Sequence, residues 1–216
     1  IVTDPYWATS TEDAIEWLTP LSKLGVSDIS VSEDTFHQEE EERDYPRNAA
    51  EAAKTLGLHA GPITIEEPTP TAIERAGLRG NMVTGGEVMF RGRAVEKLLE
   101  GLPRKPWTEF QECRHEDLKN PSRVHIDPFG FIHLCQGLTM GNFKEEPLSK
   151  LIGSYNPSSH PICGTLIEGG PAALVKKYNV PHEEGYVDEC HLCYCARLVL
   201  KSRFPKYLAP RQMYGE

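Results

Sequence analysis

The sequence contains no apolar run approaching the roughly 18 residues that a membrane-spanning helix requires, and no basic segment followed by an apolar one at its start. It is also short of basic residues, with 23 against 32 acidic ones and a formal net charge of −9. Such a surface repels nucleic-acid phosphates and anionic lipid. We therefore expect no membrane partner, no generic nucleic-acid partner and a cytoplasmic location.

Cysteine is scarce over the whole chain but clustered where it occurs. Six cysteines in 216 residues are too few for a disulfide scaffold. In a reducing compartment clustered thiols more often bind metal or carry out redox chemistry, whereas a lone cysteine is usually a small buried hydrophobe. Three of the six fall in DECHLCYCAR (188–197). Their spacing alone does not choose among a metal site, a redox dithiol and a disulfide.

The first hundred residues alternate between helical and strand patterns, which indicates parallel α/β units. Three such units do not close a barrel. The first residue is Ile1, and Val2-Thr3-Asp4 is typical of a strand running into a loop, so we expect further sequence upstream. The expected helices span 11–24, 46–56 and 92–102, and the expected strands span 26–32, 58–65 and 81–90.

A change of composition indicates a domain boundary near residue 104. The segment PRKPW (103–107) has the composition of a linker, and beyond it cysteine, histidine, glycine and proline become dense. We predict one domain over 1–104 and a second, cysteine-rich α+β domain over 105–216.

Four cysteines of the second domain form a pattern. The strand-like VHI and FIHL flank the turn signal at 127–130, and this hairpin would bring Cys113 and Cys135 towards one place. Cys190 and Cys193 then supply two more thiolates. Four thiolates suit either tetrahedral zinc or an iron-sulfur cluster.

The other cysteines are predicted to stay outside the site. The segment 194–204 has helical character, so Cys190 and Cys193 lie at a helix start and face one centre, whereas Cys195 points away and packs in the core. Cys163, in the loop-like HPICG, is structural or incidental, with a spare ligand as the alternative. Arg197 is free to balance the negative charge of a cluster.

The residues after Cys135 bear on the choice of metal. Gly137, Gly141 and Asn142 would let the backbone approach an inorganic core and offer amide hydrogens to its sulfides. This favours a cluster over zinc.

At this point the motifs resemble a known family. The GxxxxC from Gly130 to Cys135, preceded by Cys113 and followed by GN and PLSKLI (147–152), resembles the SPASM and twitch domains of radical S-adenosylmethionine (SAM) enzymes. The sixteen residues between Cys113 and Gly130 exceed the usual spacing. The resemblance implies one auxiliary four-iron four-sulfur cluster, held by Cys113, Cys135, Cys190 and Cys193.

The first hundred residues are similar to the same family. DISVSEDTFHQ (28–38) and NAAEAAKTLGL (48–58) resemble a middle strand of the radical SAM barrel and its next helix, and FRGRAVEKL (90–98) resembles the segment that leaves the last strands. The implied fold class is α/β: the second half of a (βα) barrel, followed by a small α+β SPASM/twitch-like domain.

Polar residues at one strand tip are the expected barrel site. By resemblance Ser30, Ser32 and Asp34, with His37 nearby, lie close to the SAM ribose or the substrate. The alternative is that they cap a helix and line a solvated loop.

Two motifs of the family are missing. The CxxxCxxC that binds the catalytic cluster is absent, and Gly85-Gly86-Glu87 comes too late for the family's GGEP and lacks its proline. The chain therefore resembles the C-terminal part of such an enzyme. SAM, a second four-iron four-sulfur cluster and the missing barrel half would belong to a longer parent, and this chain alone is expected to be inactive. Its substrate is unknown.

Three other readings remain open beside this resemblance. A structural zinc module would use the same four cysteines. A metallohydrolase would combine His115, Glu116 and Asp117 with a further histidine, but no HExxH spacing is present. A thioredoxin-like dithiol would need its CxxC just after a strand. The candidate further histidines are His125, His133 and His160.

Overall fold

A computed structural model describes residues 1–37, 44–70 and 86–216. The chain forms two compact units, one of residues 1–67 with 81–88 and one of residues 68–80 with 89–216. Residues 89–104 thus group with the cysteine-bearing unit, although the sequence suggested a boundary at 104. Among the described residues, no helix combines the length and apolar character needed to cross a membrane.

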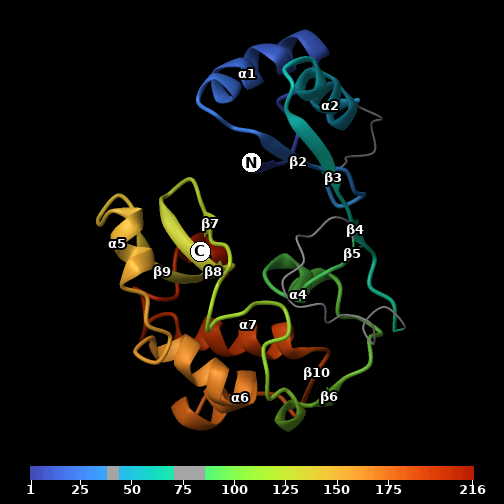
Figure 1. The fold of residues 1–216 in the computed structure, drawn as a ribbon. Helices are drawn as coiled ribbons and strands as arrows, with labels where there is room; N and C mark the ends of the chain where they lie inside the picture. The colour runs from blue at the N-terminus through green and yellow to red at the C-terminus, as the bar shows by residue number, and fades with distance from the viewer. Residues whose placement is uncertain (38–43, 71–85) are drawn as a thin grey trace. The chain divides into compact units, whose positions relative to one another are not determined.

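The first unit is built from successive βα connections (Figure 1). Its three-stranded parallel sheet has the sequential order β1-β2-β3, and Ser30 of β2 pairs with Val2 on one side and Gly61 on the other. The elements are β1 (Val2–Thr3), α1 (Thr11–Lys23), β2 (Asp28–Ser32), α2 (Tyr45–Thr55) and β3 (His59–Ile63).

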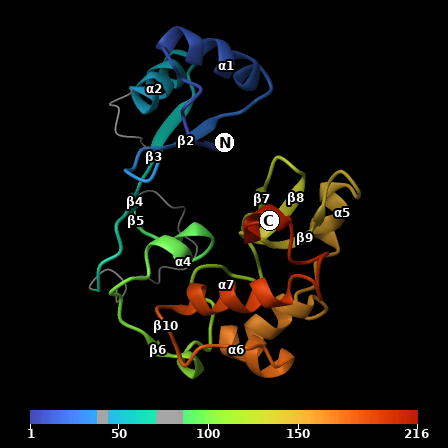
Figure 2. The same cartoon turned by 180° about the vertical axis from the view of Figure 1, so that it is seen from behind.

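Small side chains let the two helices of this unit pack closely. Ser10 caps α1 by accepting a hydrogen bond from the Asp13 amide at 3.1 Å, and the helix ends within one residue of its prediction. Three alanines of α2 are fully buried beside α1, and Figures 1 and 2 both show the helices side by side. The buried core of this unit consists of Ala8, Ala14, Leu18, Ile29, Val31, Ala49, Ala52, Ala53 and Leu58.

The later α/β elements differ from their predictions. The strand expected over 81–90 is described only as β5 (Gly86–Glu87), which pairs in parallel with β4 (Ile65–Glu66); residues 81–85 lie outside the described residues. The helix expected over 92–102 is the short α4 (Arg93–Lys97). The described strands form no closed barrel, so the partial barrel stays a prediction.

The second unit contains the predicted hairpin. Strands β7 (His125–Ile126) and β8 (Phe131–Cys135) are antiparallel, and β9 (Leu138–Asn142), which was not predicted, adds a third strand. The carboxylate of Asp127 builds the turn by accepting hydrogen bonds from the amides of Phe129 and Phe131, both at 2.9 Å. Cys135 is therefore held at the end of a fixed strand.

Two helices of the same unit, α6 (Pro161–Tyr178) and α7 (Glu189–Leu200), lie side by side below the sheet in Figures 1 and 2. The prediction of a loop at HPICG is wrong, because His160 caps α6 through its ring and Pro161 occupies the first helical position. The remaining elements are β6 (Lys105–Pro106), η1 (Trp107–Glu109), α5 (Leu148–Gly153), β10 (Gly185–Tyr186) and η2 (Arg211–Tyr214).

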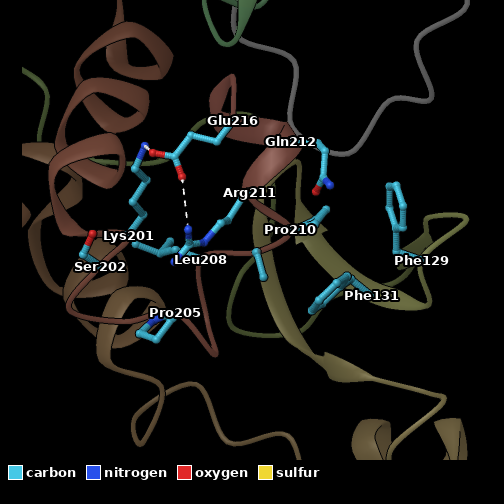
Figure 3. Close-up of a pocket in the computed structure, with 11 residues that line it drawn as sticks. Phe129, Phe131, Lys201, Ser202, Pro205, Leu208, Pro210, Arg211, Gln212 and Glu216 are labelled. Atoms are coloured by element: carbon cyan, nitrogen blue, oxygen red, sulfur yellow. Dashed lines mark ion pairs between the residues drawn. The ribbon is translucent and has the colours of Figure 1, made fainter.

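The C-terminal segment packs back on the second unit. Leu208, Ala209 and Tyr214 are buried. Figure 3 shows a pocket of about 420 Å³ between this segment and the hairpin, where Glu216 pairs with Lys201 at 2.5 Å and approaches Arg211 at 3.9 Å.

Candidate metal centre

The thiols of four cysteines line one cavity in the second unit, here called the four-thiol cavity. Cys113 comes from the loop before β7, Cys135 from the end of β8, and Cys190 and Cys193 from the first turns of α7. These are the four residues singled out from the sequence. Their convergence is a feature of the structure, whereas their binding of metal stays a prediction.

The start of α7 orients two of these thiols. Asp188 caps the helix by accepting a hydrogen bond from the amide of His191 at 2.7 Å. The helix begins at Glu189, so the prediction that the CxxC motif lies at a helix start is confirmed. Residues three apart on a helix share a face, and both Cys190 and Cys193 line the cavity.

A kink in α6 positions the loop that carries Cys113. Gly170 has φ of 63° within the helix, and a Cβ there would lie 2.2 Å from the carbonyl carbon of Gln111. The next turn of α6 binds the same loop, since the Ala172 amide donates to the Phe110 carbonyl at 3.0 Å. Only glycine permits this approach, so α6 fixes the position of Cys113.

Two arginines also line the cavity. Arg91, just before α4, donates from Nη1 to Cys135 Sγ at 3.1 Å. Arg197 of α7 is only 2% exposed and donates from Nη1 to the Gln136 carbonyl at 2.8 Å. Nothing in the sequence pattern singled out Arg91, because it lies 44 residues from its cysteine partner.

The guanidinium of Arg197 has an incomplete set of partners. Its Nε is buried without a hydrogen-bond partner, and no carboxylate of the described residues forms an ion pair with it. Burial acts to lower the pKa of Arg197, but the Tyr214 hydroxyl and the thiols of Cys193, Cys135 and Cys190 act to raise it, and the net shift is upward. The groups around this buried cation are therefore mainly thiols.

Burial controls the protonation of the thiols themselves. It raises the pKa of Cys113 to about 12, helped by the charges of Cys135 and Cys193, and it also raises the pKa values of Cys190 and Cys193. Without metal these thiols are protonated at neutral pH. A reactive redox dithiol needs a lowered thiol pKa, so the raised pKa values of Cys190 and Cys193 disfavour a thioredoxin-like role. A metal ion would displace the thiol protons.

The thiols are spread more widely than a single ion requires. In the described part of the chain, the group of possible ligand atoms that all lie within 4.8 Å of one another is His115, Asp188 and Cys190, and it includes none of the other three cysteines. Tetrahedral zinc with Zn–S bonds of about 2.3 Å needs thiolates about 3.8 Å apart. As they stand in the structure, the four thiols are therefore not arranged as the ligands of one zinc ion.

The other two cysteines lie outside the cavity lining. Cys195 is half-buried and packs against the core of the unit, and burial raises its pKa to about 11. Cys163 is fully buried in α6, where it contacts the hydroxyl of Tyr155. Both act as packing residues in this structure.

The role expected for Gly137, Gly141 and Asn142 beside an inorganic core stays a prediction, and the structure shows which other groups surround these residues. A Cβ on Gly137 would meet the hydroxyl of Tyr214 at 2.9 Å, and one on Gly141 would meet Leu151 at 2.7 Å. Asn142 donates to the Phe129 carbonyl at 3.2 Å. The two glycines let the sheet pack closely against neighbouring side chains, and none of the three residues is among those that line the four-thiol cavity.

The polar residues of β2 occupy buried positions in the first unit. Ser30 and Ser32 are buried strand residues, and Asp34 follows the strand. The Asp34 carboxylate accepts hydrogen bonds from the amides of Phe36 at 3.0 Å and Ile65 at 3.2 Å. It also lies 2.8 Å from Nδ1 of His37. Asp34 is thus occupied in holding its own loop and the start of β4.

The histidines proposed for a hydrolytic metal are dispersed. His125 is exposed on β7, and His133 is buried with its Nε2 2.9 Å from Asp127 Oδ2. His160 caps α6, and the carboxylate of Asp117 accepts hydrogen bonds from amides of its own loop. Among the described residues, only His115 of this set belongs to a possible ligand group.

No protein-family model, curated protein or solved structure matches the chain. The function is therefore argued from the residues and the geometry of the four-thiol cavity.

Proposed function

We propose that the chain is the C-terminal region of a radical SAM protein, and that Cys113, Cys135, Cys190 and Cys193 hold an auxiliary four-iron four-sulfur cluster. The chemistry of the donor set fits, since iron-sulfur clusters are held by cysteine thiolates. The cluster would supply one-electron transfer or help to position a substrate. The radical chemistry itself requires SAM and the catalytic cluster of a longer parent chain.

The observation that carries the proposal is the setting of Arg197. A buried guanidinium is stable only when it is paired with an anion or fully hydrogen-bonded. Here it has an unpaired Nε, no carboxylate partner within the described residues, and three thiols around it. Metal-bound thiolates carry the negative charge that this cation lacks, whereas protonated thiols do not.

A complete set of four thiolates leaves no iron without a protein ligand. This favours electron transfer over direct binding of substrate to the cluster. The hydrogen bond from Arg91 to Cys135 adds a second positive charge beside the thiolates. Such contacts to the sulfurs tune the reduction potential of a cluster.

The first unit supports the proposal less directly. Its parallel strands follow one another in sequence order, and Ser32 lies at the carboxyl end of β2, where barrel sites lie. Within the proposal, Ser30 and Ser32 approach SAM or the substrate in the parent. Asp34 is a weaker candidate because its carboxylate is already hydrogen-bonded.

The test is reconstitution of the full chain under anaerobic conditions, with analysis of iron, acid-labile sulfide and zinc. We expect about four irons and four sulfides per chain, as a single cluster requires. The reduced protein should give the electron paramagnetic resonance spectrum of a one-electron-reduced cluster. Stoichiometric zinc without labile sulfide, after anaerobic preparation in iron-rich medium, would contradict the proposal and favour a structural zinc module.

A further inference from the structure

Three side chains beside the four-thiol cavity form a second possible ligand set. We propose that His115, Asp188 and Cys190 bind a single divalent cation of the zinc class, in a site that shares Cys190 with the cluster set. This inference goes beyond the proposed function, because two of the three ligands have no part in holding the cluster.

The geometry of the three ligand atoms fits one ion. The imidazole nitrogen, the carboxylate oxygen and the thiol sulfur all lie within 4.8 Å of one another. An ion at the centre of such a triangle would be at most about 2.8 Å from each atom, against about 2.0 to 2.3 Å in zinc sites. Side-chain adjustments of at most about 0.5 to 0.8 Å close this gap.

The ligands come from two fixed segments of chain. His115 follows Cys113 in the loop held by the kink of α6, and Asp188 and Cys190 lie at the start of α7. A metal-bound histidine usually directs its other ring nitrogen at a carboxylate. Glu189 fits that role, because its buried Oε1 has no hydrogen-bond partner and lies 3.7 Å from Nε2 of His115.

The charge of the set suits a buried cation. A divalent ion, one thiolate, one carboxylate and one neutral imidazole sum to no net charge, so burial of the complex carries little electrostatic penalty. Three protein ligands leave a fourth tetrahedral position for water or a small anion. Binding displaces the proton of the Cys190 thiol to solvent.

The shared ligand makes the two occupants compete. A Cys190 thiolate bound to the cluster is no longer available to the single ion, and the reverse also holds. The site of His115, Asp188 and Cys190, here called the mixed set, is therefore filled in protein that lacks the cluster. There its ion keeps Cys190 coordinated, and that ion must leave before the cluster assembles.

The experiment titrates Co²⁺ into the cluster-free full chain carrying Cys135→Ala, which removes the four-thiol set and leaves the mixed set intact. We expect one ion per chain, a charge-transfer band of single-thiolate intensity, and displacement by Zn²⁺. His115→Ala and Asp188→Asn, added separately, should each weaken binding at least tenfold, and Asn retains the helix cap. The control His125→Ala, at an exposed histidine outside the set, should leave the affinity unchanged.

Two outcomes overturn the inference: binding that His115→Ala and Asp188→Asn do not change, or no binding in the Cys135→Ala protein. A separate measurement keeps the two proposals apart. His115→Ala in the wild-type background should still accept a full complement of iron and sulfide. If wild-type protein binds Co²⁺ through the mixed set but never loads a cluster, the proposed function fails while this inference stands.

Discussion

Arg91 donates a hydrogen bond from its Nη1 to the Sγ of Cys135 over 3.1 Å, and the two residues are 44 positions apart in the sequence. The contact places a guanidinium against one of the four thiols of the cavity. A positive donor stabilises a thiolate more as the cluster gains negative charge, so Arg91 should make the cluster easier to reduce.

Replacing Arg91 should therefore lower the reduction potential of the cluster. Arg91→Gln should lower the midpoint potential by tens of millivolts, about 60 mV for each 1.4 kcal/mol of lost stabilisation. Redox titration followed by electron paramagnetic resonance measures the shift. The matched control is Arg93→Gln, two positions along the chain and outside the cavity lining, which should leave the potential unchanged. Equal shifts in both variants would show that only the overall charge matters.

The neighbouring cysteines of α7 should behave differently. Cys193→Ala removes a thiol of the cavity and should abolish stable cluster loading, whereas Cys195→Ala removes a packing residue and should leave iron and sulfide content intact. Iron and labile-sulfide analysis of both variants after the same reconstitution is sufficient. Equal losses would mean that Cys195 is also a ligand.

The glycine in the kink of α6 is predicted to be essential for the position of Cys113. Gly170→Ala forces a Cβ to within 2.2 Å of backbone and should destabilise the protein by about 1 to 3 kcal/mol, with reduced cluster loading. Chemical denaturation and iron analysis measure the two effects.

The control for this variant is Gly153→Ala in α5, where a Cβ has open space. That substitution should be neutral or stabilising by up to about 1 kcal/mol, with full loading. Unchanged stability and loading in the Gly170→Ala protein would contradict the account of the kink.

The cap of α6 should make stability depend on pH. Burial lowers the pKa of His160, although its contact with the Thr139 carbonyl acts in the opposite direction. Its Nδ1 accepts hydrogen bonds from the amides of Ile162 and Cys163 and must stay unprotonated to do so. Because the unfolded state binds a proton below about pH 6.5 and the folded state resists it, the free energy of unfolding should fall as the pH drops below that value.

His160→Asn tests this assignment, since Asn caps a helix without titrating. The variant should lose about 1 kcal/mol at pH 7.5 through poorer packing, but it should lose less further stability than wild type between pH 7 and pH 5. Urea denaturation at several pH values gives both curves. Parallel curves for the two proteins would place the pH dependence in other groups.

Local patterns in the sequence predicted several elements correctly. The hairpin around residues 127–130 follows from a turn signal between two strand-like segments, and the place of the CxxC at the start of α7 follows from the helical character of the residues after it. These features depend on interactions between residues close in sequence. The same locality explains why Cys190 and Cys193 could be separated from Cys195 by helical spacing.

Other features could not be predicted from the sequence, because they depend on packing between segments that are far apart in the chain. The sequence around HPICG did not indicate α6, which runs as two helical stretches joined at the non-helical Gly169 and Gly170, where the loop that leads to Cys113 packs into the kink. Likewise, the sequence did not show that Tyr214 packs against Gly137 and Leu151 against Gly141.

The sequence by itself determined which thiols are available, their spacing and the short elements that carry them, because spacing and capping act over a few residues. Only the tertiary structure decided that four of these thiols face one cavity with Arg91 and Arg197, and that His115 and Asp188 reach Cys190. Those relationships join segments far apart in the chain, and they arise from how the strands, the kinked helix and α7 pack together.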